Sequence, residues 1–345
     1  MARQANVSRA TVTNVLNHPD RVTRDTRRRV EAAMSDLDFV RNESARQLRA
    51  GRSRTVALLV FDVANPFFAA LAQGAESVLG DSGSLMILCD TAADQGREDR
   101  YLAMLAEQRV QGVLVTPLDR GNPRLDELVA RGTAVVVVAL SSVDALDRCS
   151  VSTDDRVGGF LAMSHLLEAG HTRVGYLGGF FGAGAISERF IGAEQAVSQS
   201  PVPISLTTVA ATAPTIDAGA HGSRLIAAMP AAERPTAVFC YNDLLALGLL
   251  NGLLQRGFRV PQDIAIIGYD DIDYCPTASV PLTSIHQPAA DIGRAAAALL
   301  LEESRDGDRH RHRQVLFPPV LVVRASSGAR DPEAAGSLRS TQTAH

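Results

Sequence analysis

From residue 54 onward, short apolar runs alternate with amphipathic stretches along the chain. The apolar runs, rich in β-branched residues, lie at 55–63, 84–90, 112–117, 134–140, 173–179, 236–243 and 264–271. The stretches with helical periodicity include 68–80, 97–109, 155–169, 187–198, 217–228 and 243–257. Apolar strands joined by helices are typical of parallel sheets covered on both faces. The predicted strands are too many to fit well in a single sheet. The pattern therefore predicts an α/β fold of two similar lobes with a cleft between them.

The amino-terminal segment follows a helical pattern instead. Ser8 is placed to cap a helix over residues 9–16, which Asn-His-Pro-Asp at 17–20 ends. Thr23 is placed to cap a second helix over residues 24–37, whose apolar positions recur at helical spacing. The order helix, turn, helix is typical of small all-α DNA-binding units.

Charge is divided unevenly along the chain. Residues 1–54 hold 12 Arg against 6 Asp or Glu, a net charge of +6, whereas the whole chain of 345 residues carries −4 and the remainder therefore −10. A basic amino-terminal segment followed by an acidic remainder indicates that only the amino-terminal segment binds a polyanion. No apolar run approaches the roughly 18 residues that span a bilayer, and no export signal is visible, so we expect a cytoplasmic protein.

Side chains that could carry metal or catalytic chemistry are scattered. The four cysteines, which form no C-x-x-C pair, are predicted to be reduced structural thiols: Cys89, Cys149, Cys240 and Cys275. His310 and His312 stand two residues apart in a charged stretch, which predicts a solvated loop and no metal site. We find no G-x-G-x-x-G and no Ser/His/Asp set, so we expect neither an enzyme nor a cofactor.

Several motifs together resemble the lactose-repressor (LacI/GalR) family of transcription regulators. They are NVSRATVTNVLNHPDRV, NESARQLRAGRSRTVALLV, DVANPFFAALAQGAE, VSTDDRVGG, GHTRVGYLGG, SERFIGAEQA, RPTAVFCYNDLLALG, VPQDIAIIGYDDI, PLTSIHQP and LVVRASS. The resemblance covers nearly all of residues 1–327. The family pattern begins a few residues before Met1, so we expect the native chain to start upstream of Met1.

The resemblance implies a helix-turn-helix headgroup and a two-lobed sensor, similar to periplasmic binding proteins, with three crossovers between the lobes. The predicted domains are a headgroup at 1–41, a hinge helix or linker at 42–53, a sensor N-lobe at 54–168 and 284–312, a C-lobe at 169–283 and 313–330, and a mobile tail at 331–345. A homodimer follows, because one headgroup reads only half of a palindromic operator on double-stranded DNA.

The first helix matches the family's recognition helix, and its residue types suit DNA. Arg9 can bond bidentately to guanine, Asn14 can bond to adenine, and Ala10 can touch a thymine methyl group. Short polar side chains suited to phosphate contacts stand beside them: Ser8, Thr11, Thr13 and Asn17.

In similar proteins the segment that matches residues 42–49 folds only on DNA, where paired hinge helices insert a leucine between base pairs. Leu48 is the matching residue, and Ala45 lies one turn before it. A wedge of this kind kinks the duplex. The other reading of Leu48 is a linker residue that packs on the sensor.

Polar residues follow several predicted strands, where the ends of parallel strands face the cleft. By resemblance, the residues expected to contact a small-molecule effector are Asp62, Phe67, Asp154, Arg189, Asn242 and Asp270. We assign Asp243 to a helix N-cap and Gln287 to a lobe crossover. A sugar is the expected effector class, although Pro214 stands where many relatives carry a stacking aromatic residue.

The sequence therefore predicts a transcriptional regulator, most often a repressor in this family, whose operator affinity an effector controls. The rival reading is a solute-binding protein of the same fold that does not bind DNA effectively. Such a protein would need an export signal and would not need residues 1–52.

Overall fold

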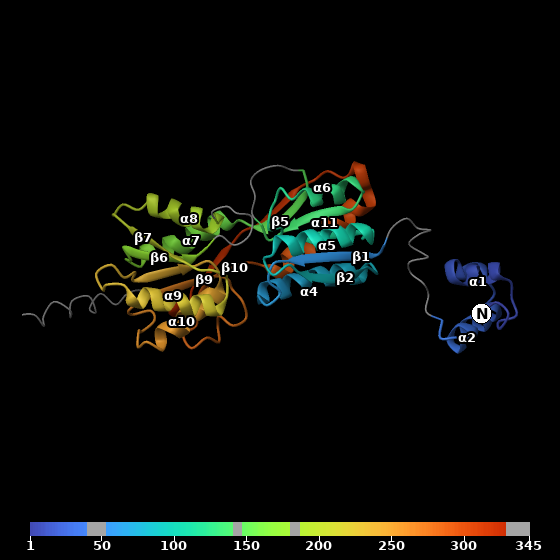
Figure 1. Ribbon diagram of the computed structural model, residues 1–345, viewed down its shortest axis with the longest axis horizontal. Helices are drawn as coiled ribbons and strands as arrows, with labels where there is room; N and C mark the ends of the chain where they lie inside the picture. Colours follow the sequence, from blue (N-terminus) through green and yellow to red (C-terminus); the bar gives the residue numbers. More distant parts are fainter. Residues whose placement is uncertain (40–52, 141–146, 180–186, 329–345) are drawn as a thin grey trace, which may run out of the picture. The chain divides into compact units, whose positions relative to one another are not determined.

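We describe the protein from a computed structural model, in which residues 1–39, 53–140, 147–179 and 187–328 are described. The chain divides into two units, Met1–Ser53 and Arg54–His345 (Figure 1). Most of the predicted hinge, with Ala45 and Leu48, and the predicted tail lie outside the described residues.

The first unit is a small helical domain. Its elements are α1 (Arg9–Asn17), the short 3-10 helix η1 (Pro19–Arg21) and α2 (Arg24–Asp36). The Oγ of Ser8 accepts a hydrogen bond from the Thr11 amide at 3.0 Å, and Thr23 caps α2 in the same way. Both predicted helices and both predicted caps are confirmed. Ala5, Val15, Val30 and Ala33 form its buried core.

The second unit begins with a lobe built on a parallel six-stranded sheet of order β11-β5-β4-β3-β1-β2. The strands are β1 (Thr55–Val60), β2 (Leu85–Asp90), β3 (Gly112–Val115), β4 (Ala134–Val138), β5 (Cys149–Thr153) and β11 (Gln314–Phe317). Helices α4 (Pro66–Asp81) and α11 (Ala289–Asp306) cover one face, and α5 (Gln95–Glu107) and α6 (Pro123–Ala130) cover the other. The 3-10 helix η2 (Gly307–Arg309) follows α11.

The second lobe repeats this plan with the sheet order β12-β10-β9-β8-β6-β7, in which only β12 is antiparallel to its neighbour. Its strands are β6 (Arg173–Gly178), β7 (Ser205–Ala210), β8 (Ala237–Cys240), β9 (Ala265–Asp270), β10 (Thr283–His286) and β12 (Val320–Val322). Helices α7 (Asp155–Glu168) and α8 (Glu188–Ser198) lie on one face, α9 (Ile216–Ala228) and α10 (Asp243–Leu254) lie on the other, and the 3-10 helix η3 (Ala325–Ser327) ends the described chain. No helix among the described residues is long and apolar enough to cross a membrane.

The chain crosses between the lobes three times, but not at the predicted boundaries. Helix α7 was expected in the first lobe, yet it packs on α8 in the second. Strand β10 belongs wholly to the second sheet, and β11, expected in the second lobe, pairs with β5 in the first. Each real crossing therefore comes between a strand and the next element, at Asp154, at Gln287-Pro288 and at Pro318-Pro319. Prolines at two of these points cannot donate to a sheet ladder.

Three helix pairs touch through their backbones at glycines. A Cβ added at Gly74 in α4 would lie 2.0 Å from the carbonyl oxygen of Ala290, and one added at Gly293 in α11 would lie 2.0 Å from that of Leu71. The same reciprocal arrangement joins α7 with α8 and α9 with α10, through Gly159, Gly192, Gly219 and Gly248. No side chain fits between such helices, so each pair is fixed as one rigid layer.

Asp243 is a fully buried carboxyl group in the second lobe. The prediction that it caps a helix is wrong, because Asn242 holds that position and accepts from the Leu245 amide at 3.0 Å. Asp243 instead accepts from the hydroxyl of Ser284 at 2.6 Å and from the amide of Ile272 at 2.9 Å. Burial, and then the nearby charge of Asp270, raise the pKa of Asp243.

The contrast between two glycines of α4 tests the helix contact. We expect Gly74→Ala to cost about 1–3 kcal/mol of unfolding free energy, because the new methyl group meets backbone. Gly80→Ala in the same helix has only Glu76 Oε1 nearby, at 3.7 Å, and should stabilise by about 0.5–1 kcal/mol. All five tyrosines lie in the second unit and the chain has no Trp, so tyrosine fluorescence during urea unfolding reports on that unit alone. Equal urea midpoints for the two variants would contradict the contact.

Asp243 should make the stability of the second unit depend on pH. Its raised pKa means that the folded state keeps a proton that the unfolded state has lost above the ordinary value of 3.8. The free energy of unfolding that this bound proton contributes is present at low pH and is lost as the pH rises. We expect Asp243→Asn to remove this loss, so the wild type should weaken relative to the variant as the pH is raised in urea unfolding series.

Asp263→Asn is the control with the opposite sign. Hydrogen bonds from Arg259 lower the pKa of Asp263, so its stabilising effect is lost as the pH falls. The same pH slope in Asp243→Asn and in the wild type would contradict the assignment.

Candidate functional site

A buried carboxylate lies at the end of β9, where the two lobes meet. Asp270 Oδ2 accepts from Asn65 Nδ2 at 3.2 Å, and Oδ1 accepts from Gln287 Nε2 at 2.8 Å. Asn65 belongs to the first lobe and Gln287 to a crossover, so this one carboxylate joins both lobes and the segment between them. Burial raises the pKa of Asp270, and the charge of Arg189 opposes that rise.

The backbone at this point is strained. Asp270 has φ 109° and Asp271 has φ 57°, in the region that side chains with a Cβ rarely adopt. Such conformations persist where surrounding contacts fix them, and they concentrate at functional sites. Here the fixing contacts are the bonds to Asp270 and an ion pair of 2.7 Å between Asp271 and Arg324.

Arg189 is the buried cation of the site. Its Nε donates to Asp155 Oδ1 at 3.1 Å, its Nη1 donates to the carbonyl of Tyr241 at 2.7 Å, and Nη1 lies 3.6 Å from Asp270 Oδ1. The guanidinium carbon lies 3.8 Å from the centre of the Tyr269 ring. Burial lowers the pKa of Arg189, but Asp155 and Asp270 raise it by more, so the guanidinium stays protonated.

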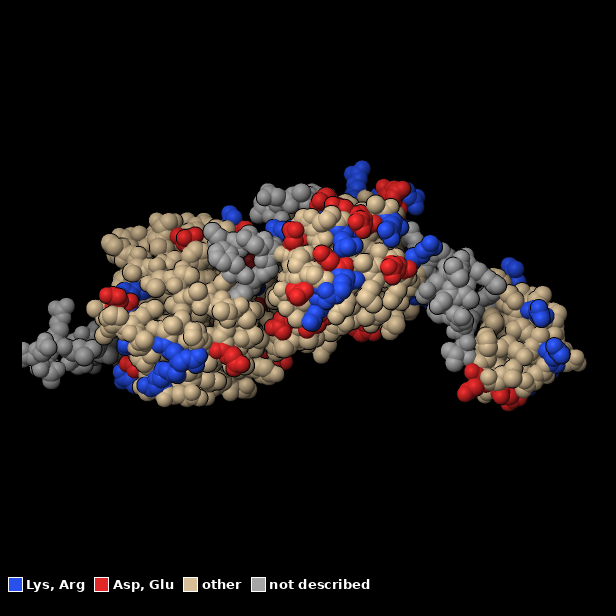
Figure 2. All heavy atoms as spheres, in the orientation of Figure 1, with Lys and Arg blue, Asp and Glu red and all other residues tan. Residues whose placement is uncertain are grey.

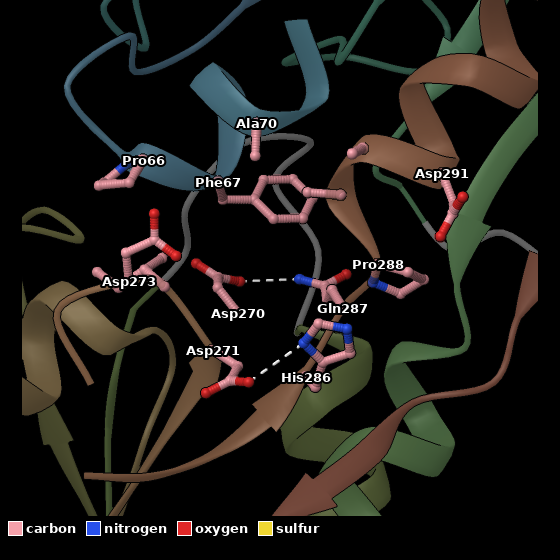
Figure 3. Close-up of a pocket in the computed structure, with 13 residues that line it drawn as sticks. Pro66, Phe67, Ala70, Asp270, Asp271, Asp273, His286, Gln287, Pro288 and Asp291 are labelled. Atoms are coloured by element: carbon pink, nitrogen blue, oxygen red, sulfur yellow. Dashed lines mark hydrogen bonds and ion pairs between the residues drawn. The ribbon is translucent and has the colours of Figure 1, made fainter. Parts of the chain in front are cut away.

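A cavity of about 280 Å³ opens beside Asp270. Figure 3 shows the ring of Phe67, from α4 in the first lobe, facing Asp270 and Gln287, with His286 paired to Asp271 below. The lining residues are Pro66, Phe67, Ala70, Asp270, Asp271, Ile272, Asp273, His286, Gln287, Pro288, Ala289, Ala290 and Asp291. One wall is therefore apolar and aromatic, and the other presents carboxylates, an imidazole and an amide.

The six predicted effector residues divide into two groups. Phe67 and Asp270 line the cavity, and Arg189 touches Asp270 behind it. The other three do not line it: Asp62 accepts from the Ala64 amide, Asp154 caps α7, and Asn242 caps α10 and donates to the carbonyl of Pro214. A direct effector contact of these three stays a prediction.

Two members of the site were not predicted as effector contacts, and a third has a role beyond the predicted one. Asn65 and Asp155 were not singled out, although Asn65 directly precedes a helix-starting proline and Asp155 follows Asp154 in VSTDD. Gln287 lies at the crossover, as assigned, but it also holds Asp270. The signals that could have identified them are the position of Asn65 before a proline and that of Asp155 just after a strand end.

In the first unit, α1 presents a polar face to solvent. Arg9, Ala10, Thr13 and Asn14 are exposed, as is the cap Ser8, while Thr11 is half-buried and its Oγ1 lies 2.9 Å from the Ser8 hydroxyl. The opposite face of the helix carries buried Val15. The side chain of Asn17 lies outside the described part of the structure.

The segment around His310 is a loop, as predicted, and Arg309 and Arg311 are exposed, but the prediction that its histidines are solvated is wrong. The side chain of His310 is only 2% exposed, and that of His312 is 27% exposed. Both rings turn toward Cys149 in the first lobe.

Comparison with known proteins agrees with this architecture. Residues 1–42 match the lacI family of bacterial regulatory proteins, and residues 163–327 match a periplasmic-binding-protein-like domain. A transcriptional repressor named PurR from Photobacterium profundum is 33% identical over 94% of this chain and 97% of its own length. One from Vibrio parahaemolyticus is 35% identical over 94% and 96%.

Solved structures show the same fold. A complex of the transcriptional regulator CelR with cellobiose is 30% identical, with a TM-score of 0.69 over 94% of this chain and 98% of that one. A LacI-family regulator from Enterococcus faecium with bound ribose is 28% identical, with a TM-score of 0.72 over 80% and 100%. The lac repressor dimer bound to operator is 24% identical, with a TM-score of 0.79 over 94% and 97%.

The predicted fold class and family are therefore confirmed, and the relatives that match nearly end to end are transcriptional repressors and not enzymes. On this identity and coverage, the chain belongs to the lacI family of transcriptional regulators, with a helix-turn-helix unit at its amino terminus and a two-lobed sensor domain behind it.

Proposed function

We propose that the protein is a homodimeric repressor whose affinity for a palindromic operator is set by a small, neutral, hydroxyl-rich effector bound beside Asp270. The exposed polar face of α1 supports the proposal of DNA binding. The chemistry of the cavity walls supports the proposal of an effector.

The face of α1 suits the major groove. Arg9 and Asn14 offer the planar donors that bind guanine and adenine edges, and Ala10 between them is small enough for close approach. Ser8 and Thr13 add short hydroxyls for phosphates. Figure 2 shows basic and acidic side chains at the surface of the small unit, and residues 1–54 together carry a net charge of +6.

A dimer follows from the size of this reading surface. A single recognition helix covers only part of one major groove, and specific affinity needs two half-sites related by two-fold symmetry. The lac repressor of the same fold is described as a dimer on its operator, which supports the proposal.

The cavity walls favour a sugar-like effector. The carboxylates of Asp270 and Asp273 and the amide of Gln287 suit hydroxyl groups, and Phe67 offers a flat apolar face. Among the described lining residues none is Arg and four are Asp, so the lining favours a neutral ligand over a phosphate or carboxylate. Two regulators of this fold are described with bound ribose and cellobiose.

The contacts around Asp270 supply a means of control. The bond from Asn65 to Asp270 crosses the lobes directly, and a ligand between Phe67 and Asp270 would touch both lobes at the same place. Such a ligand binds the closed and open arrangements with different affinity, which is the condition for shifting one toward the other.

Base recognition by α1 gives the first test. An operator is first selected from random duplex DNA, and binding is then measured by fluorescence anisotropy at several salt concentrations. We expect Arg9→Ala and Asn14→Ala each to weaken binding by about 1–3 kcal/mol and to relax preference at one base position. Arg28→Ala, at an exposed arginine of α2, is the control and should leave base preference intact. Failure to select any sequence would favour the rival reading of a solute-binding protein.

The hinge prediction can be tested on the same operator. Leu48→Ala should lower affinity, because the wedge supports the DNA bend. Unchanged affinity in that variant would count against the wedge and leave the reading by α1 in place.

Ligand class gives a separate test by thermal shift and calorimetry. Ribose or cellobiose should raise the melting temperature, whereas ribose 5-phosphate should not, because its charge faces aspartates. Phe67→Leu should weaken binding by about 0.5–1.5 kcal/mol through loss of the ring face, and Phe61→Leu, outside the cavity lining, should not. Binding of a nucleobase instead of any sugar would overturn the sugar class but keep the site.

A further inference from the structure

Four side chains with metal-binding atoms converge at the amino end of β5. They are Cys149, at the start of that strand, Glu303, in the last turn of α11, and His310 and His312, between η2 and β11. Their ligand atoms all lie within 4.8 Å of one another. Three separate segments of the first lobe therefore meet at this cluster.

The spacing of these atoms fits a tetrahedral ion. Cys149 Sγ lies 3.1 Å from His310 Nε2 and 3.8 Å from His312 Nδ1, and His312 Nδ1 lies 4.0 Å from Glu303 Oε2. Zinc bonds of about 2.0–2.3 Å at tetrahedral angles place ligand atoms roughly 3.3–3.8 Å apart. The observed separations run from 3.1 Å to at most 4.8 Å, so they bracket the tetrahedral values.

The cluster is buried and contains an unpartnered oxygen. Cys149 is fully buried and Glu303 is 8% exposed. Within the described residues, Glu303 Oε2 is buried and makes no hydrogen bond of normal distance and angle. Burial raises the pKa of Glu303, although the Val135 amide and the Cys149 thiol lie close enough to oppose that rise. A buried carboxylate oxygen without a partner is unfavourable, and a cation between it and the two rings would supply what it lacks.

A second carboxylate, that of Glu302, lies near the other ring nitrogen of His310. Glu302 Oε1 lies 3.8 Å from His310 Nδ1, and Arg313 forms an ion pair with Glu302. Metal-binding histidines commonly pair their second nitrogen with a carboxylate, which fixes the tautomer and aims the other nitrogen at the ion. Here the separation of 3.8 Å is longer than a hydrogen bond, so Glu302 is a nearby charge, and the other ring nitrogen, Nε2 of His310, faces Cys149 Sγ at 3.1 Å.

We propose that Cys149, Glu303, His310 and His312 form a binding site for a zinc-like divalent cation. One sulfur, two imidazole nitrogens and one carboxylate oxygen are the mixed donor set that zinc takes, and they suit magnesium or calcium poorly. Binding replaces the thiol proton, which leaves to solvent. Four protein ligands leave no open position, so the ion is structural: it ties the end of α11 and the segment before β11 to β5.

The site is separate from the effector cavity. In a parallel sheet the amino ends of all strands lie on one side and the carboxyl ends on the other. Cys149 is at the amino end of β5, whereas Asp62 follows the carboxyl end of β1, so the two lie at opposite ends of the strands. Loss of the ion should therefore lower the stability of the first lobe without removing any residue that lines the cavity.

The test uses the full-length protein without an affinity tag, stripped by a chelator and titrated with zinc against a chromophoric competitor. We expect one ion per chain and a rise in melting temperature on zinc addition. Cobalt should give the thiolate charge-transfer absorption and the strong visible bands of a tetrahedral site. Cys149→Ser and His312→Ala should bind at least about tenfold more weakly and lose the zinc-dependent shift.

Matched controls separate this site from chance binding. Cys89→Ser removes the half-buried thiol of β2, and His221→Ala removes an exposed imidazole of α9; both should bind zinc as the wild type does. Glu302→Gln keeps all four ligands and should still weaken binding by about tenfold, so it serves if a ligand variant does not fold by circular dichroism. No zinc binding by the wild type, or equal affinity in wild type, Cys149→Ser and Glu302→Gln, overturns the proposal.

Discussion

A carboxylate as deeply buried as that of Asp270 needs partners, because removing a charge from water without them is very unfavourable. Its partners come from three parts of the chain: Asn65 from the first lobe, Gln287 from a crossover, and Arg189 from the second lobe. One buried charge thus sets how the lobes meet. The positive φ angles of Asp270 and Asp271 are tolerable because these bonds hold the backbone in place.

The glycine contacts explain why motion should be concentrated between the lobes. Each lobe contains a helix pair whose backbones touch, and such pairs slide or bend only at high cost in packing. The crossovers at Asp154, Gln287-Pro288 and Pro318-Pro319 are short segments between a strand and the next element. Rigid lobes with short connections are the arrangement in which a small ligand produces a rotation of whole domains.

Much of the fold could be predicted from the sequence, because buried parallel strands and amphipathic helices leave strong periodic signals. Helices α1 and α2, their caps and the main alternating elements follow this pattern. Short edge strands such as β11 and β12 do not, since three or four half-exposed residues carry little periodicity. The boundary at β11 was misplaced for that reason. Strand β10 and helix α7 were assigned to the wrong lobe because only long-range pairing and packing decide which lobe an element joins.

The site was less predictable, because its contacts are long-range. Phe67, Arg189 and Asp270 could be named by resemblance, but nothing local shows that Asn65 reaches Asp270, 205 residues away along the chain. The cap of α10 was assigned to Asp243 when the neighbouring Asn242 takes it, since both residue types favour that position. His310 reads as solvated in a charged stretch, and only the folded chain places it against Cys149.

Asn65 performs two tasks with one amide group. Its oxygen caps α4 by accepting from the Phe67 amide at 3.0 Å, while its nitrogen donates to Asp270. An aspartate at this position would retain the cap but set two carboxylates against each other across the lobes. The single NH2 group of Asn65 is therefore what lets one side chain end a helix in one lobe and bind a carboxylate of the other.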